Sequence, residues 1–136
     1  MNGISVKAVW GFSALMGILM NISYAAAGEL EPGALEKVCS LWHDILVEAG
    51  LSPYAFFWIF LLLGSMAVSL VTVLEGVKGF FSSTGGFLGT YTVLVGIMYS
   101  DMIYLLLGGI MAIAGLLVAS EADREKALRG HRIQYL

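Results

Sequence analysis

Charged residues are scarce in this sequence, and their scarcity is the first constraint on what the protein can be. Asp, Glu, Lys and Arg make up 12% of the 136 residues, against roughly 25% in soluble domains. Hydrophobic residues make up 59%, and the mean hydropathy is +0.87. These values favour a chain embedded in a bilayer, and the length permits one compact unit.

The sequence also lacks the residues that several kinds of site require. Its single cysteine, Cys39, excludes a disulfide within one chain, and we expect it to act as a small apolar helix residue, with an intermolecular disulfide or a lipidated thiol as alternatives. There is no basic stripe of the kind that binds nucleic acid. There is also no metal-binding, phosphate-loop or nucleophile-elbow motif. We therefore expect no nucleic-acid partner, no cofactor, no metal and no enzymatic activity.

Only two histidines are present, His43 and His131. A bis-histidine haem needs both imidazoles at one depth, whereas the topology derived below places these residues on opposite sides of the membrane. We expect His43, beside Trp42, to be an exposed helix residue, with a ligand for a partner's cofactor as the alternative.

One apolar stretch, from Phe80 to Ser120, is too long for a single membrane crossing, which takes about 20 residues. Its one acidic residue, Asp101, would cost roughly 2.5–3.5 kcal/mol at the centre of a bilayer, so it is better placed at a turn. The stretch therefore predicts a transmembrane hairpin of two helices, Gly79–Met98 and Met102–Ala119.

A further crossing is predicted over Tyr54–Leu74. Ser52 and Pro53 are a typical cap and first-turn pair, and aromatic residues follow them, as in the interfacial belt of membrane helices. The crossing ends at Glu75–Lys78, which we expect to be a solvated turn, with an ion pair inside the membrane as the alternative. Residues 54–120 thus hold three transmembrane helices.

Residues 1–27 have two interpretations. Lys7 precedes an apolar run, and the small residues of Ser23–Ala27 satisfy the rule for signal-peptidase cleavage. The same segment is a signal peptide or, if it is not cleaved, a first transmembrane helix, because Ala8–Ala27 is long enough to span. Both interpretations place Glu29 on the far side of the membrane.

Residues 28–53 predict an extracytoplasmic amphipathic helix, between Pro32 and Ala49. Its polar residues are mainly acidic, which disfavours docking on anionic lipid. We therefore expect its apolar stripe to bind a partner protein. The expected contact residues are Leu35, Val38, Trp42 and Ile45.

Small residues recur on each of the last three crossings with alternating spacings of four and three. This pattern predicts a tight bundle, because small residues let membrane helices approach closely. The expected helix-packing residues are Ser65, Ser69, Thr72 and Gly76 in the first crossing, Gly85, Gly89, Thr92 and Gly96 in the second, and Gly108, Ala112, Gly115 and Ala119 in the third.

Residues 121–136 form a charged tail in which Gly130 is the expected end of a helix. Since loops rich in Lys and Arg stay in the cytoplasm, Lys7, Lys78 and the tail should share the cytoplasmic side. The sequence therefore predicts an all-α, polytopic protein of three to four transmembrane helices with one extracytoplasmic amphipathic helix. We expect it to be integral to a bacterial inner (plasma) membrane.

These features suggest a non-catalytic accessory or structural subunit of a larger membrane protein complex. The expected partners are other membrane subunits or copies of the chain itself, and the lipid bilayer. The alternative is a self-assembling pilin-like or pore-forming subunit. A signal-peptide-like start followed by glycine-rich apolar hairpins is similar in layout to the precursors of conjugative pilins, although the basic tail departs from that layout. A small transporter is disfavoured because no charge lies inside a crossing.

The topology predicts that Asp101 lies on the extracytoplasmic side. In a variant without Cys39, Asp101→Cys should react with an impermeant thiol reagent added to intact cells. Reaction only after the membrane has been opened would contradict the four-crossing arrangement.

Overall fold

The computed structural model describes residues 5–134, with side chains described for residues 5–129, and it is all-helical over that range. The elements are α1 (Val6–Ala26), a 3-10 turn (Gly33–Leu35), α2 (Glu36–Glu48), α3 (Pro53–Glu75), α4 (Val77–Tyr99) and α5 (Met102–Gln134). Four of them, α1, α3, α4 and α5, are long and apolar enough to cross a membrane. The all-α class is therefore confirmed, and these helices are consistent with an integral membrane protein.

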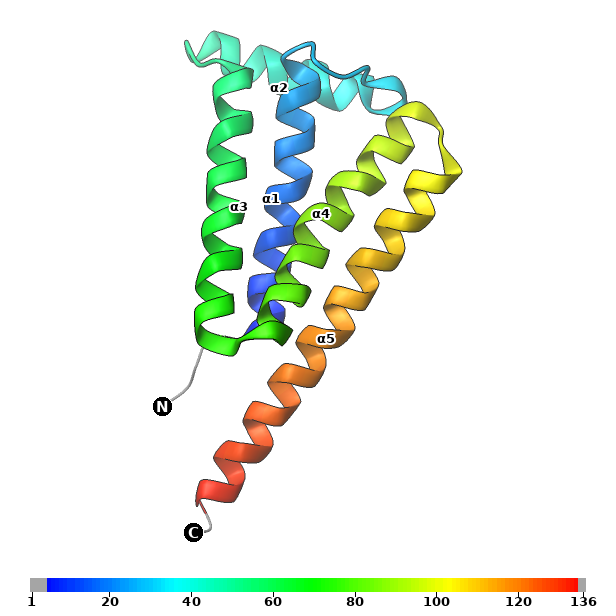
Figure 1. Ribbon diagram of the computed structural model, residues 1–136. Helices are drawn as coiled ribbons and strands as arrows, with labels where there is room; N and C mark the ends of the chain where they lie inside the picture. The colour runs from blue at the N-terminus through cyan, green and yellow to red at the C-terminus, as the bar shows by residue number, and fades with distance from the viewer. Residues whose placement is uncertain (1–4, 135–136) are drawn as a thin grey trace.

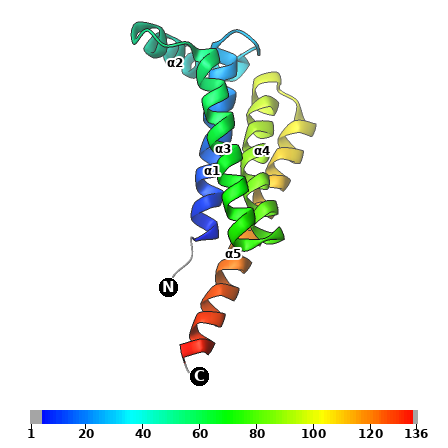
Figure 2. The same cartoon turned by 60° about the vertical axis from the view of Figure 1, so that its left-hand side comes forward.

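The four long helices stand side by side, and α2 lies across one end of them (Figure 1). We call this the α2 end. The start of α1, the α3–α4 turn and the last part of α5 lie at the opposite end, which we call the tail end, and α5 extends beyond the other helices there (Figure 2). Successive long helices therefore run in opposite directions, as successive crossings must.

Local signals set the helix boundaries. The Ser52 hydroxyl accepts a hydrogen bond from the Ala55 amide, and Pro53 follows at the first position of α3, which confirms the cap predicted from sequence. Gly76 turns the chain from α3 into α4 with a φ of 73°, a conformation that glycine adopts without steric cost. Asp101 accepts a hydrogen bond from the Ile103 amide at 2.9 Å and so caps α5.

The end of α5 differs from the expectation. Gly130 was expected to end the helix, but the backbone stays helical as far as Gln134. A glycine ends a helix only when it takes a left-handed conformation, and inside a helix it costs only about 1 kcal/mol. The charged tail thus begins as a continuation of α5, whereas the side chains of residues 130–136, including His131, lie outside the described part of the chain.

α4 is the central helix, with contacts to α1, α3 and α5. Against α5 the two backbones almost touch. A Cβ atom added to Gly89 would lie 2.7 Å from the Ala112 amide nitrogen, and one added to Gly108 would lie 2.6 Å from the Gly89 carbonyl oxygen. Only glycine permits such an approach, which maximises dispersion contact between helices in lipid.

α1 is the most enclosed of the four long helices: half of its most apolar window is buried, against one third or less for the others. Polar contacts hold it against its neighbours. The buried hydroxyls of Ser13 and Ser83 are hydrogen-bonded. The Asn21 side-chain amide donates to the Tyr91 carbonyl at 3.3 Å, and the Trp10 indole donates to a carbonyl of α5 at 3.1 Å.

The contrast between two glycines tests the close approach of α4 and α5. We expect Gly89→Ala to destabilise the fold by about 1–3 kcal/mol, because the added methyl meets backbone atoms. A Cβ atom at Gly109 would meet nothing within 4 Å, so Gly109→Ala should be neutral or stabilise α5 by up to about 1 kcal/mol. Unfolding of both purified variants in detergent would measure the difference, and equal stability would contradict the packing argument.

Candidate functional site

The inner face of α2 is buried on the α2 end of the bundle. Cys39 is 3% exposed and Leu46 is 4% exposed, and Leu35 packs against the cluster that holds Cys39. The Trp42 indole donates a hydrogen bond to the Ser23 hydroxyl of α1 at 2.9 Å. Its ring also packs against two phenylalanines of α3. α2 therefore makes stabilising contacts with both α1 and α3.

A second apolar stripe runs along the outside of α2. Val38, Leu41 and Ile45, spaced three and four residues apart, are 46%, 62% and 50% exposed. We call these three residues the outer stripe. The expected partner-binding set is thus divided: Leu35 and Trp42 pack within the chain, whereas Val38 and Ile45 remain on the surface.

Cys39 and His43 both line a pocket of about 170 Å³ beside α2, but their side chains differ in exposure. Burial raises the pKa of the Cys39 thiol, which keeps it in the less reactive protonated form. His43 is exposed and lies 3.4 Å from the carboxylate of the adjacent Asp44. Within the described residues, no group of three or more His, Cys, Asp or Glu side chains is arranged to hold a metal ion.

The small residues of α4 and α5 lie largely between these two helices. Gly85, Gly89 and Gly96 each face backbone atoms of α5, while Gly108 and Gly115 face backbone atoms of α4. Ala112 lies opposite Gly89, and Ala119 is fully buried. The Thr92 hydroxyl donates a hydrogen bond to the Leu88 carbonyl of its own helix.

The corresponding residues of α3 are placed differently. Ser65 and Ser69 are exposed on the outside of the bundle. The Thr72 hydroxyl donates to the Val68 carbonyl of its own helix, and Gly76 forms the turn. α3 packs instead through residues that the spacing rule did not select: Phe60, Gly64 and Val71.

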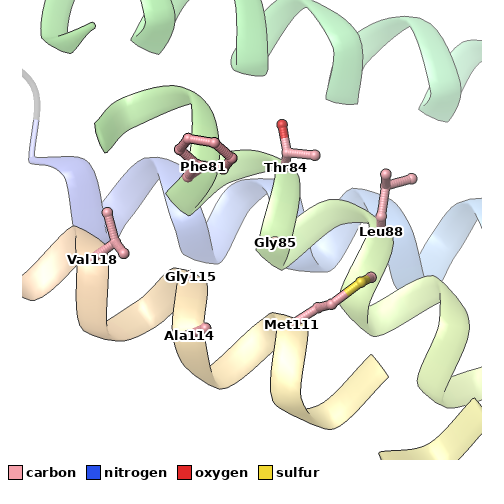
Figure 3. Close-up of a pocket in the computed structure, with 8 residues that line it drawn as sticks. All are labelled: Phe81, Thr84, Gly85, Leu88, Met111, Ala114, Gly115 and Val118. Atoms are coloured by element: carbon pink, nitrogen blue, oxygen red, sulfur yellow. The ribbon is translucent and has the colours of Figure 1, made fainter. Parts of the chain in front are cut away.

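An apolar groove of about 340 Å³ follows the contact between α4 and α5. Phe81 and Val118 lie at one end of it, and Leu88 and Met111 lie at the other (Figure 3). Gly85, Ala114 and Gly115 form part of its lining, with Thr84 beside them. A second groove, of about 460 Å³, lies between α1 and α3. Both grooves lie on helices that are long and apolar enough to cross a membrane, where lipid or another helix would cover them.

At the tail end, α5 caps α1. The Asp123 carboxylate accepts hydrogen bonds from the amides of Val6 at 2.7 Å and Lys7 at 3.0 Å, and from the Ser5 hydroxyl at 3.0 Å. A carboxylate at this position also interacts favourably with the positive end of the helix dipole. The first and last helices are therefore joined outside the apolar part of the bundle.

Ion pairs join the α3–α4 turn to α5 as well. Glu75 pairs with Lys126 at 3.2 Å, and Lys78 pairs with Glu121 and Glu125. The turn is therefore neither simply solvated nor a site for a local pair between Glu75 and Lys78, because both residues have their partners on α5.

The polar contacts of α1 were missed by the sequence analysis. Their signal was present: Ser13, Gly17 and Asn21 are four residues apart and lie on one face of an otherwise apolar helix. The same segment also fits a signal peptide, and a cleaved peptide needs no polar face for helix packing, so the sequence alone does not single out this face.

The docking of α2 can be tested through Cys39. Trp42→Ala removes both the indole hydrogen bond and the aromatic contacts, and because Trp42 is half-buried the cost should approach but not reach that of truncating a fully buried Trp, about 3–5 kcal/mol. We therefore expect α2 to open more often and Cys39 to be alkylated at least about tenfold faster. Ile45→Ala, on the exposed face of the same helix, is the control. Equal alkylation rates in the two variants would show that Trp42 does not hold α2.

Comparisons with known proteins identify no relative of this chain, so a function must be proposed from the surfaces described above. No protein-family model, no curated protein and no solved structure matches the chain.

Proposed function

We propose that this protein is a non-catalytic subunit of a larger membrane protein complex and that it contacts a partner subunit through the outer stripe of α2. The observation that carries the proposal is that Val38, Leu41 and Ile45 remain exposed after α2 has already buried its inner face. Full burial of such side chains contributes roughly 1.5–3 kcal/mol each. A helix that has two apolar faces and buries only one retains a surface for a second contact.

The polar residues of α2 favour protein over lipid as the second contact. Glu36, Asp44 and Glu48 outnumber the single base, Lys37. Helices that lie on anionic membranes are usually rich in Lys and Arg on their polar face. An acidic helix with an apolar stripe is better matched to a protein surface that supplies cations around an apolar centre.

We place the tail end in the cytoplasm and the α2 end on the opposite side of a bacterial inner (plasma) membrane. The support is the distribution of bases: Lys7, Lys78, Arg124, Lys126 and Arg129 belong to the segments gathered at the tail end. Only Lys37 belongs to α2. Cytoplasmic loops carry this excess of bases.

We also propose that α1 stays in the mature protein. Ser13 and Asn21 make buried hydrogen bonds to α4, and Asp123 caps the start of the helix. Loss of α1 after cleavage would leave the buried Ser83 hydroxyl without its partner Ser13, and each buried polar group left without a partner costs about 1–3 kcal/mol.

A second candidate function is self-assembly, and the outward face of α3 favours it. Ser65 and Ser69 are small, exposed and four residues apart on a membrane-spanning helix. Such a pair permits close contact with a helix of another copy. A homo-oligomer formed in this way would match the pilin-like or pore-forming alternative.

A charge placed in the outer stripe tests the leading proposal. We expect Ile45→Glu to abolish co-purification of the partner subunit in mild detergent, because it buries an unpaired carboxylate in the contact. Val47→Glu makes a similar change at another exposed position of α2, 52% exposed and outside the outer stripe, and should retain the partner at wild-type stoichiometry.

Two results would overturn this proposal. Retention of every partner by Ile45→Glu would remove the outer stripe as the contact. A homogeneous oligomer of the chain alone, disrupted by Ser69→Leu and not by Ile45→Glu, would establish the second candidate instead.

A further inference from the structure

A polar pocket lies at the tail end, next to the α4–α5 groove. The pocket has a volume of about 290 Å³, and its lining residues are Glu75, Val77, Lys78, Ala122, Glu125 and Arg129. Val77 is four residues before Phe81, and Ala122 is four residues after Val118. The pocket therefore begins one helical turn beyond the apolar groove.

Helical spacing places both cavities on the same side of the α4–α5 contact. On α5, Met111, Gly115, Val118, Ala122, Glu125 and Arg129 follow one another at intervals of four and three, and so share one face. On α4, Val77, Phe81, Thr84 and Leu88 do the same. The two cavities therefore follow one another along the same side of the contact, first the apolar groove and then the charged pocket.

The lining residues of the pocket include two acids and two bases, and one of these bases has no ion pair with another described side chain. Glu75 is paired with Lys126, whereas Glu125 shares Lys78 with Glu121. Arg129 lines the pocket, and no ion pair joins it to another described side chain. Its guanidinium is suited to two parallel hydrogen bonds with a phosphate. The carboxylates beside it would oppose a second negative charge on the same ligand and attract a cation.

We propose that the groove and the pocket together bind one zwitterionic phospholipid with an ammonium headgroup. One acyl chain lies in the groove between Phe81 and Met111, the phosphate lies against Arg129, and the ammonium lies near the carboxylate of Glu125. A free phosphate would leave the apolar groove uncovered, and an anionic headgroup would bring no cation to Glu121 and Glu125, which share the single Lys78. This site lies at the other end of the bundle from the outer stripe of α2, and it does not depend on the proposed function.

Native mass spectrometry of the full-length protein in detergent tests the site. After delipidation, the protein should bind one phosphatidylethanolamine in preference to phosphatidylglycerol, and glycerol phosphate should not displace it. Arg129→Gln should weaken binding about tenfold, the loss expected for one charge-assisted contact with phosphate. Arg124→Gln, at an exposed position of α5 outside the pocket, should leave binding unchanged.

Filling the groove gives a second, independent measurement. Ala114 lines the groove and is itself exposed (Figure 3), so Ala114→Trp should block the acyl chain without disturbing buried packing. Ile113→Trp, at the adjacent position, which is 61% exposed and does not line the groove, is the control. The thermal unfolding temperature of both variants verifies that they fold.

The proposal is overturned if both Ala114→Trp and Arg129→Gln retain the wild-type affinity for phosphatidylethanolamine. A preference for phosphatidylglycerol would overturn the assignment of the headgroup. Co-purification of a helix of another chain that crosslinks to residue 114, in place of lipid, would overturn the assignment of the ligand.

Discussion

Close backbone contact around α4 is the constraint on which the rest of the bundle depends. Lipid offers no hydrophobic drive for helices to associate, so contact must come from shape and from hydrogen bonds. α4 has a glycine toward each neighbour: Gly79 faces α3, Gly86 faces α1, and Gly89 faces α5. Each would bring a Cβ atom within 3.0 Å of another helix's backbone. The positions of all the long helices follow from these three approaches.

Much of the helix content could be predicted from the sequence, because its signals are local. The lengths of the apolar runs, the cap at Ser52 and the acid at Asp101 each act within a few residues. The direction in which a helix face points is different, because it depends on contacts between residues far apart in the sequence. Ser65 and Ser69 obey the same spacing as the glycines of α4, yet they face outward while Gly89 faces inward. Periodicity defines a face of a helix and does not say what lies opposite that face.

The candidate interaction surface was predictable only in part, for a related reason. α2 carries two apolar stripes, and the sequence alone does not indicate which one the chain itself covers. Trp42 was expected to reach a partner, but its indole N–H finds an acceptor on Ser23 in a different helix. Buried indoles usually have such a partner. The apolar stripe that α2 leaves exposed is formed by Val38, Leu41 and Ile45, and it can be identified only once the inner stripe has been assigned.

The contact of Asp123 with the start of α1 has a consequence for biosynthesis. Asp123 is made 117 residues after Val6, the residue whose amide it accepts. The Val6 and Lys7 amides of α1 therefore lack this acceptor until the ribosome has produced α5. The start of α1, the first helix to be made, thus gains these hydrogen bonds only when α5, the last helix, has been made. A chain that stops short of this residue keeps the Ser5 cap on the Ala8 amide but leaves the Val6 and Lys7 amides without the Asp123 carboxylate, a difference that distinguishes an unfinished molecule from a finished one.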